Sequence, residues 1–375
     1  MNPESKPTQT GPRYWWRAPL MFMAALALLA GLWGGVQRIG WALPTITLYL
    51  PAQHGPLMVS GFLGTLISLE RAVALSQFQN GRRSYYLVPL LAGLGALALV
   101  LTIDPLIARG LSSLAALGLV LIFVVICRLQ WTTDHLVMGV GALLWLVGNS
   151  LWLVGYPLYQ VVPWWAGFLI LTIAGERLEL GRVLLHNRAT RLAFLVTGLF
   201  FLAGLLFSLV AFDAGLRLAG VGLVALGLWL LRFDIARRTI RKTGLTRFIA
   251  ACLLLGYVWL VAGGLLWAAY GGQYLAGPIY DAMLHMIFMG FVFSMIFGHA
   301  PIIVPALLGV QVPYTPLFYI HLSLLHLSLL LRVGGDLLLW LPGRRWGGLL
   351  NGVVVLLFLL VTAVAIIRGR RRSDR

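Results

Sequence analysis

Apolar stretches of about twenty residues follow one another from Pro19 to Ile367, and they restrict the possible folds more than any other feature of the chain. As a helix, each stretch is long enough to cross a hydrocarbon core of roughly 30 Å. With 60% hydrophobic and 10% charged residues, the 375-residue chain leaves no region for a soluble catalytic domain. The sequence therefore predicts an all-α, polytopic membrane protein, with the lipid bilayer as its main partner.

Turns that are charged or rich in proline or glycine divide the chain into twelve predicted spans. They cover residues 19–37, 51–75, 85–103, 106–127, 136–156, 162–182, 192–211, 215–232, 246–270, 278–308, 314–338 and 347–367. We predict one transmembrane helical domain over residues 19–368. It lies between a cytoplasmic N-terminal tail, 1–18, and a basic cytoplasmic tail, 369–375.

The net charge of +17 is a signal of membrane topology, and it gives no reason to expect nucleic acid as a partner. The basic residues lie in short loops, and most of the 28 Lys and Arg fall on one side if the N-terminus is cytoplasmic. Cytoplasmic loops of membrane proteins carry such an excess. We therefore expect twelve spans with both termini inside, in a bacterial inner membrane.

A short pattern recurs in the second, sixth and tenth spans. A Gly–Phe pair begins at residues 61, 167 and 290, and a polar residue follows nine positions after each glycine. These polar residues are Glu70, Glu176 and His299. The spacing of four spans predicts three four-helix pseudo-repeats around a pseudo-threefold axis.

Glu70 and Glu176 are each followed by an arginine, near the predicted cytoplasmic ends of their spans. One interpretation is structural, with the arginines reaching the lipid headgroups as anchors. The other is a proton relay through the two glutamates, because a desolvated carboxyl group can exchange protons.

Five of the seven histidines lie inside apolar spans, where ionisable side chains usually face the bundle interior or a cofactor. They are His54, His285, His299, His321 and His326. The other two, His135 and His186, fall at helix ends or in a loop, where we expect them to be solvated. The helical rise places His54, His285 and His326 in the outer half of the membrane, on three different spans.

Histidines at one depth on facing helices suit axial ligation of haem, and the same three imidazoles could instead bind copper. All five intramembrane histidines are candidate metal ligands. Three arginines at the loop before the last span, Arg332, Arg344 and Arg345, oppose the general charge trend. The Arg344–Arg345 pair could hold haem propionates, while the simpler alternative is that all these residues are satisfied core or loop residues.

Other chemistries lack a motif in this sequence. There is no H-E-x-x-H, no phosphate-binding G-x-x-x-x-G-K-[ST] and no nucleophile elbow. Cys127 and Cys252 lie inside apolar spans and form no C-x-x-C pair, so they indicate packing. Hydrolase and ATPase functions are therefore unsupported, and whether the protein is an enzyme stays open.

The arrangement resembles the haem–copper oxidase catalytic subunit and, more loosely, the NnrS family of haem- and copper-containing membrane proteins linked to nitric oxide stress. The resemblance rests on the twelve spans, the four-span pattern, the histidines of spans 2 and 10 and the outer arginine pair. It implies that His54 and His285 ligate a low-spin haem b and that Arg344 and Arg345 hold its propionates.

The sequence also departs from the oxidase pattern. The oxidase family takes copper ligands from spans 6 and 7, and those spans contain no histidine here. Oxygen reduction at a binuclear centre is therefore not expected.

These observations leave three hypotheses. The first is a membrane protein that binds haem through His54, His285 and His326, with copper as a further option, an electron donor as a partner and a redox or nitric-oxide-related role. The second is a proton-coupled secondary transporter that uses Glu70 and Glu176. The third is an assembly or structural factor without ligand chemistry.

Overall fold

The computed structural model describes residues 14–79, 81–181 and 188–373, and their regular structure is entirely helical. The spans are α1 (Ala18–Arg38), α2–η2–α3 (His54–Phe78), η3–α4 (Ser84–Val100), α5 (Pro105–Leu129), α6 (Thr133–Leu153), α7 (Leu158–Leu180), α8 (Arg188–Phe207), α9 (Phe212–Phe233), α11–η4 (Gly244–Gln273), α12–η5–α13 (Pro278–Leu308), α14 (Phe318–Leu337) and α15 (Leu341–Ser373). Short segments are η1 (Trp15–Arg17), before α1, and α10 (Ala236–Thr239), before α11.

Each predicted span falls on one of these helices, so the all-α architecture of about twelve spans is confirmed. In the described residues, eleven helices are long and apolar enough to cross a membrane, and Ser84–Val100 is the shorter apolar helix. The last helix continues through Ser373, into the segment predicted to be a tail.

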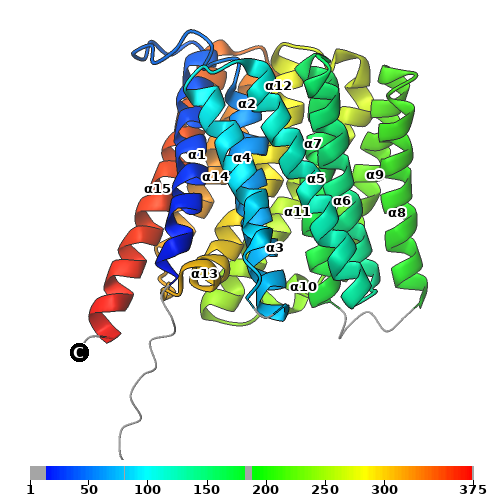
Figure 1. Ribbon diagram of the computed structural model, residues 1–375. Coiled ribbons are helices and arrows are strands. Elements are labelled where there is room, and N and C mark those ends of the chain that lie inside the picture. Colours follow the sequence, from blue (N-terminus) through cyan, green and yellow to red (C-terminus); the bar gives the residue numbers. More distant parts are fainter. Residues whose placement is uncertain (1–13, 80, 182–187, 374–375) are drawn as a thin grey trace, which may run out of the picture.

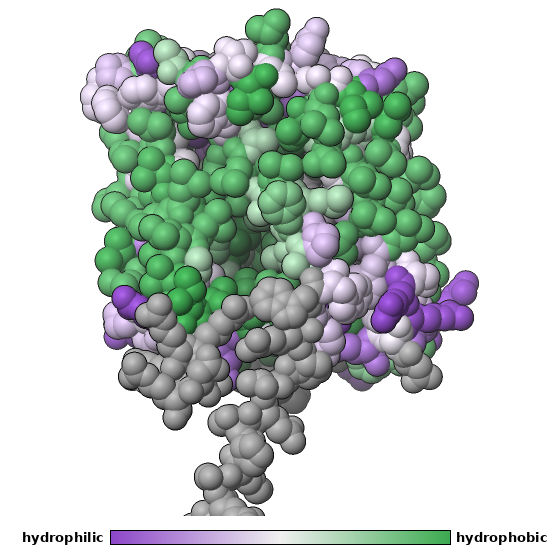
Figure 2. All heavy atoms as spheres, turned by 60° about the vertical axis from the view of Figure 1, so that its left-hand side comes forward, coloured by the Kyte–Doolittle hydropathy of each residue, from purple (hydrophilic) through white to green (hydrophobic). Residues whose placement is uncertain are grey.

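Both ends of the helical bundle lie on the same face. In Figure 1, α1 begins and α15 ends at the bottom of the view, and we call this side the lower face and its opposite the upper face. Figure 2 shows a broad hydrophobic band between two polar rims. The apolar side chains of this band match a lipid environment, in which the backbone groups of every span are satisfied by its own helical hydrogen bonds.

The three spans that share the Gly–Phe pattern are the inner helices of the bundle. In their most apolar stretches, 72% of residues are buried in His54–Phe78, 78% in Leu158–Leu180 and 67% in Pro278–Leu308. The other eight long helices of the described chain range from 22% to 56%. The Gly–Phe pattern therefore marks the helices that other helices surround.

Two of the inner helices change to π-helical geometry just after their histidines. His54 precedes η2 (Leu57–Leu63), and His285 precedes η5 (Met286–Phe293). Each π segment contains the Gly–Phe pair of its span. Because π segments insert an extra residue into a turn and are frequent at functional sites, they single out the region of the two histidines.

We predict that Gly290→Ala destabilises the protein because an added Cβ would lie 2.4 Å from Cγ of Trp259, a rigid ring. Such overpacking costs about 1 to 3 kcal/mol, so the midpoint of thermal unfolding in detergent should fall. The matched control is Gly198→Ala on α8, whose Cβ meets no atom within 4 Å and should leave the midpoint unchanged or slightly raised. Equal midpoints for the two variants would contradict the close packing at Gly290.

Candidate functional site

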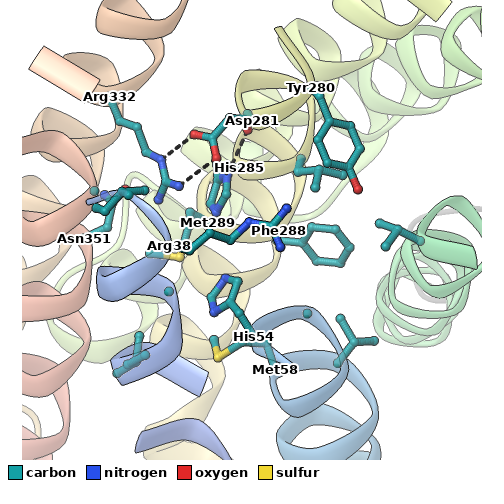
Figure 3. A pocket seen from close by; sticks show the side chains of 18 of the residues that line it. Arg38, His54, Met58, Tyr280, Asp281, His285, Phe288, Met289, Arg332 and Asn351 are labelled. Carbon is teal, nitrogen blue, oxygen red and sulfur yellow. Dashed lines mark hydrogen bonds and ion pairs between the residues drawn. The ribbon is translucent and has the colours of Figure 1, made fainter. Parts of the chain in front are cut away.

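Two of the predicted histidines face one another near the upper face. His54 begins the second span and His285 ends α12, and their ring centroids are 6.4 Å apart with planes inclined by 17°. In Figure 3 the two rings point toward one another from different helices. The fold therefore brings together two imidazoles that are 231 positions apart in the chain.

Hydrogen bonds determine which nitrogen of each ring carries the proton. Nδ1 of His54 donates to the carbonyl of Gly31 at 2.7 Å, and Nδ1 of His285 donates to the carbonyl of Asp281 at 2.8 Å. Since a carbonyl can only accept, Nδ1 is the protonated nitrogen in both rings. Each neutral ring then has its Nε2 lone pair available for a ligand.

Glycines of α1 allow the His54 ring to lie directly against the helix. A Cβ at Gly35 would lie 2.8 Å from both Nδ1 and Cε1 of His54, which is too close for any larger residue. Gly31, one turn earlier in α1, supplies the carbonyl that orients the ring. The small residues of the first span therefore position His54.

A cavity of about 350 Å³ lies around the two rings. Its walls come from α1, α7, α14, α15 and the two histidine-bearing spans, and most of its lining is apolar or aromatic, including Met58, Phe288 and Met289 (Figure 3). Three cations also line it, namely Arg38, Arg332 and Arg344. An apolar space with a few charged groups is the usual form of a small-molecule or cofactor site.

Asp281 connects His285 to two of these arginines. Its carboxylate accepts two hydrogen bonds from Arg332, at 2.8 and 2.9 Å, and lies 3.4 Å from Nδ1 of His285. Arg344 is 3.9 Å from the same carboxylate and 3.1 Å from Asp336. The result is a charged network next to His285, of which Figure 3 shows Asp281 and Arg332.

Sequence reasoning did not include Asp281, Arg332 or Arg38 in the site. One signal was present, because Asp281 lies one helical turn before His285 inside an apolar span. Arg332 was noted only as a basic residue on the outer side, and its buried position inside α14 depends on the packing of the helices.

The predicted arginine pair is divided between two environments. Arg344 lines the cavity, but Arg345 donates to the carbonyl of Gly40 at 2.7 Å and lies 5.0 Å from the centre of the Trp41 ring. Consecutive residues of α15 point about 100° apart, and Arg345 is directed toward Gly40 and Trp41 instead of the cavity. The structure therefore places Arg345 away from the histidine pair.

His326 also lies apart from the predicted outer cluster. Its Nδ1 accepts a hydrogen bond from the Trp259 indole at 2.9 Å, and it does not line the cavity. Since Nδ1 is the acceptor, the proton of the neutral ring is on Nε2, which leaves no second lone pair for a metal. His54, His285 and His326 do not form one three-ligand metal group in the described residues.

The remaining intramembrane histidines occupy two further environments. His321 is 1% exposed, and its ring contacts Phe248, Phe297, Phe318 and Phe358. His299 donates from Nδ1 to the carbonyl of Met295 at 2.7 Å. Neither residue lines the cavity of the histidine pair.

The two predicted relay glutamates meet near the lower face. Arg71 forms ion pairs with both Glu70 and Glu176, so it joins the second and sixth spans. Arg177 is 5% exposed and binds both carboxylate oxygens of Asp234, at 2.8 and 2.9 Å. The expectation that these arginines extend to the headgroups is wrong, because both find carboxylate partners on other helices or loops.

His135, which we expected to be solvated, is only 9% exposed, and His186 lies outside the described residues. His135 belongs to a group with Asp134 and Glu179 at the lower face. The Asp134–His135–Glu179 group shares no residue with either of the other two sites.

Neither the curated proteins nor the solved structures include a match to this chain. A family model described as a domain of unknown function, DUF8744, matches residues 17–367. That range includes both histidines of the pair and every span except the last residues of α15. The chain therefore belongs to the DUF8744 family.

Proposed function

We propose that this polytopic membrane protein binds haem b between His54 and His285 and takes part in one-electron redox chemistry near the upper face. The observation that carries the proposal is the facing pair of imidazoles with their Nδ1 atoms already bonded to carbonyls. The tautomer is the one in which histidine binds iron through Nε2.

The distance between the rings supports this cofactor. An imidazole nitrogen binds a transition metal at about 2 Å, so two rings on opposite sides of one metal have centroids about 6 to 6.5 Å apart. The observed separation is 6.4 Å. With both His54 and His285 holding it, the haem would supply electron transfer rather than the binding of a gas such as nitric oxide.

The cavity walls suit the remaining parts of a haem. Apolar side chains would cover the macrocycle, and the guanidinium groups of Arg38, Arg332 and Arg344 would bind the propionates. Asp281 already neutralises Arg332, and Asp336 pairs with Arg344, so the cations are held in place without the cofactor. The bound haem would supply the electron-accepting and electron-donating iron.

The inner position of spans 2, 6 and 10, with histidines on two of them, supports a distant relationship to the haem–copper oxidase and NnrS families. A copper ion bound by all three histidines is not part of this proposal, because His326 lies outside the cavity and its Nδ1 accepts from Trp259. The proposal also includes a location in a bacterial inner membrane and an electron donor as a partner.

Replacing either ligand should remove haem. In His54→Gln and His285→Gln, haem bound per purified protein should fall at least about tenfold, since even outer-shell changes weaken metal binding 10- to 100-fold. The measurement is the Soret absorbance of detergent-solubilised protein expressed with adequate haem. His326→Gln is the matched control and should keep the wild-type spectrum. A six-coordinate spectrum in both ligand variants would refute the proposed site.

Proton-coupled transport is the second candidate. Two carboxylates from two inner helices, Glu70 and Glu176, share one guanidinium, that of Arg71. The triad has one more carboxylate than cation, so a single proton would balance its charge. A proton site near the lower face could then couple to movement of a solute.

We predict that Glu70→Gln and Glu176→Gln each abolish solute-driven proton flux if transport is the function. The assay uses proteoliposomes with an entrapped pH dye and a panel of solute gradients. His54→Gln, at the opposite end of the bundle, should retain the flux. Proton flux that persists in both glutamine variants would exclude these residues as the coupling sites.

A further inference from the structure

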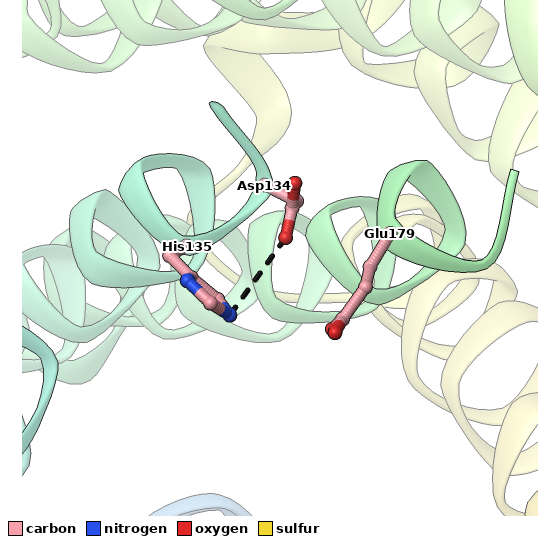
Figure 4. A group of neighbouring side chains, drawn as sticks. All are labelled: Asp134, His135 and Glu179. Atoms are coloured by element: carbon pink, nitrogen blue, oxygen red, sulfur yellow. Dashed lines mark ion pairs between the residues drawn. The ribbon is translucent and has the colours of Figure 1, made fainter. Parts of the chain in front are cut away.

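A group of three potential metal ligands lies at the lower face, where the start of α6 meets the last turn of α7. One ligand atom each from Asp134, His135 and Glu179 lies within 4.8 Å of the other two. Figure 4 shows the three side chains converging from the two helices. The His54–His285 pair is near the upper face, so this group is a separate feature of the molecule.

The helix cap accounts for the position of the carboxylate but not for that of the imidazole. Thr132 caps α6 by accepting from the backbone amide of His135, and its hydroxyl donates to Asp134 at 3.1 Å. A carboxylate in the first turn is stabilised by the helix dipole, whereas a positive charge there is disfavoured.

The backbone orients His135 as a ligand. Its Nδ1 donates to the carbonyl of Gln130 at 2.9 Å, which leaves Nε2 as the nitrogen that can bind a metal, and Nε2 lies 3.8 Å from Asp134. A histidine held by a carbonyl on its other nitrogen is the usual arrangement in metal sites.

We propose that Asp134, His135 and Glu179 bind one divalent transition-metal ion of the zinc class. One imidazole and two carboxylates suit such an ion, and water would complete the coordination. Ligand atoms around tetrahedral zinc are about 3.3 Å apart, so separations of up to 4.8 Å in this group must shorten by up to about 1.5 Å. Glu179 is half-buried at the end of α7.

A bound ion would link the N-terminus of α6 to the C-terminus of α7 at the lower face. Because the ion would bind only the folded protein, it would raise stability with increasing metal concentration. Mg²⁺ should not replace zinc, because magnesium requires oxygen ligands and keeps most of its water.

The test is calorimetric titration of the full-length protein in detergent with Zn²⁺. Wild type should bind one Zn²⁺ that Glu179→Gln and His135→Gln each bind at least tenfold more weakly, and Mg²⁺ should give no binding at this site. Asp213→Asn removes an exposed carboxylate that pairs with Arg217, and this control should match wild type. Zn²⁺ should also raise the thermal midpoint of wild type but not of Glu179→Gln.

Equal Zn²⁺ affinity in wild type and Glu179→Gln would overturn the proposal. Binding that survives in Glu179→Gln but is lost in His54→Gln would also overturn it, because the ion would then belong to the histidine pair. If His135→Gln does not fold, the Zn²⁺ affinity of Glu179→Gln decides the result, because Glu179 is only half-buried. None of these outcomes depends on whether the protein binds haem.

Discussion

The hydrocarbon core of a bilayer offers no water, and this constraint shapes every other feature of the protein. Backbone groups must be bonded within each helix, so the chain is all-helical. Polar side chains inside the membrane must find partners on neighbouring elements instead of solvent. Arg177 with Asp234, Arg71 with two glutamates, and Arg332 with Asp281 are such pairs. They connect segments distant in sequence, and breaking a buried pair leaves an uncompensated charge.

The three inner helices carry polar chemistry at both ends of the bundle. Spans 2 and 10 supply the histidine pair near the upper face, while spans 2 and 6 supply the Glu70–Arg71–Glu176 triad near the lower face. Both places are surrounded by the outer helices, which present apolar side chains to the lipid (Figure 2). This separation would let a redox site and a proton-binding site coexist in one bundle without direct contact.

The candidate site was partly predictable because helical rise converts sequence position into depth. That argument placed His54 and His285 together, and the structure has them 6.4 Å apart. The same argument included His326, which bonds to Trp259 instead, because depth does not specify the side of the helix that faces the site. Arg344 and Arg345 differ for the same reason, since one lines the cavity and its neighbour does not.

Hydrophobic runs and loop charges determined the class of the fold and the number of spans, and the recurring Gly–Phe pair singled out three of the spans. These are local or periodic properties of the sequence. In lipid, helices satisfy the hydrogen bonds of the backbone within each apolar segment, so such properties are enough to indicate the fold class. Only the tertiary structure decided which polar groups meet. The tautomers of the histidines, the partners of Asp281 and the convergence of Asp134, His135 and Glu179 all depend on helix rotation and packing, which arise from contacts between residues far apart in the chain.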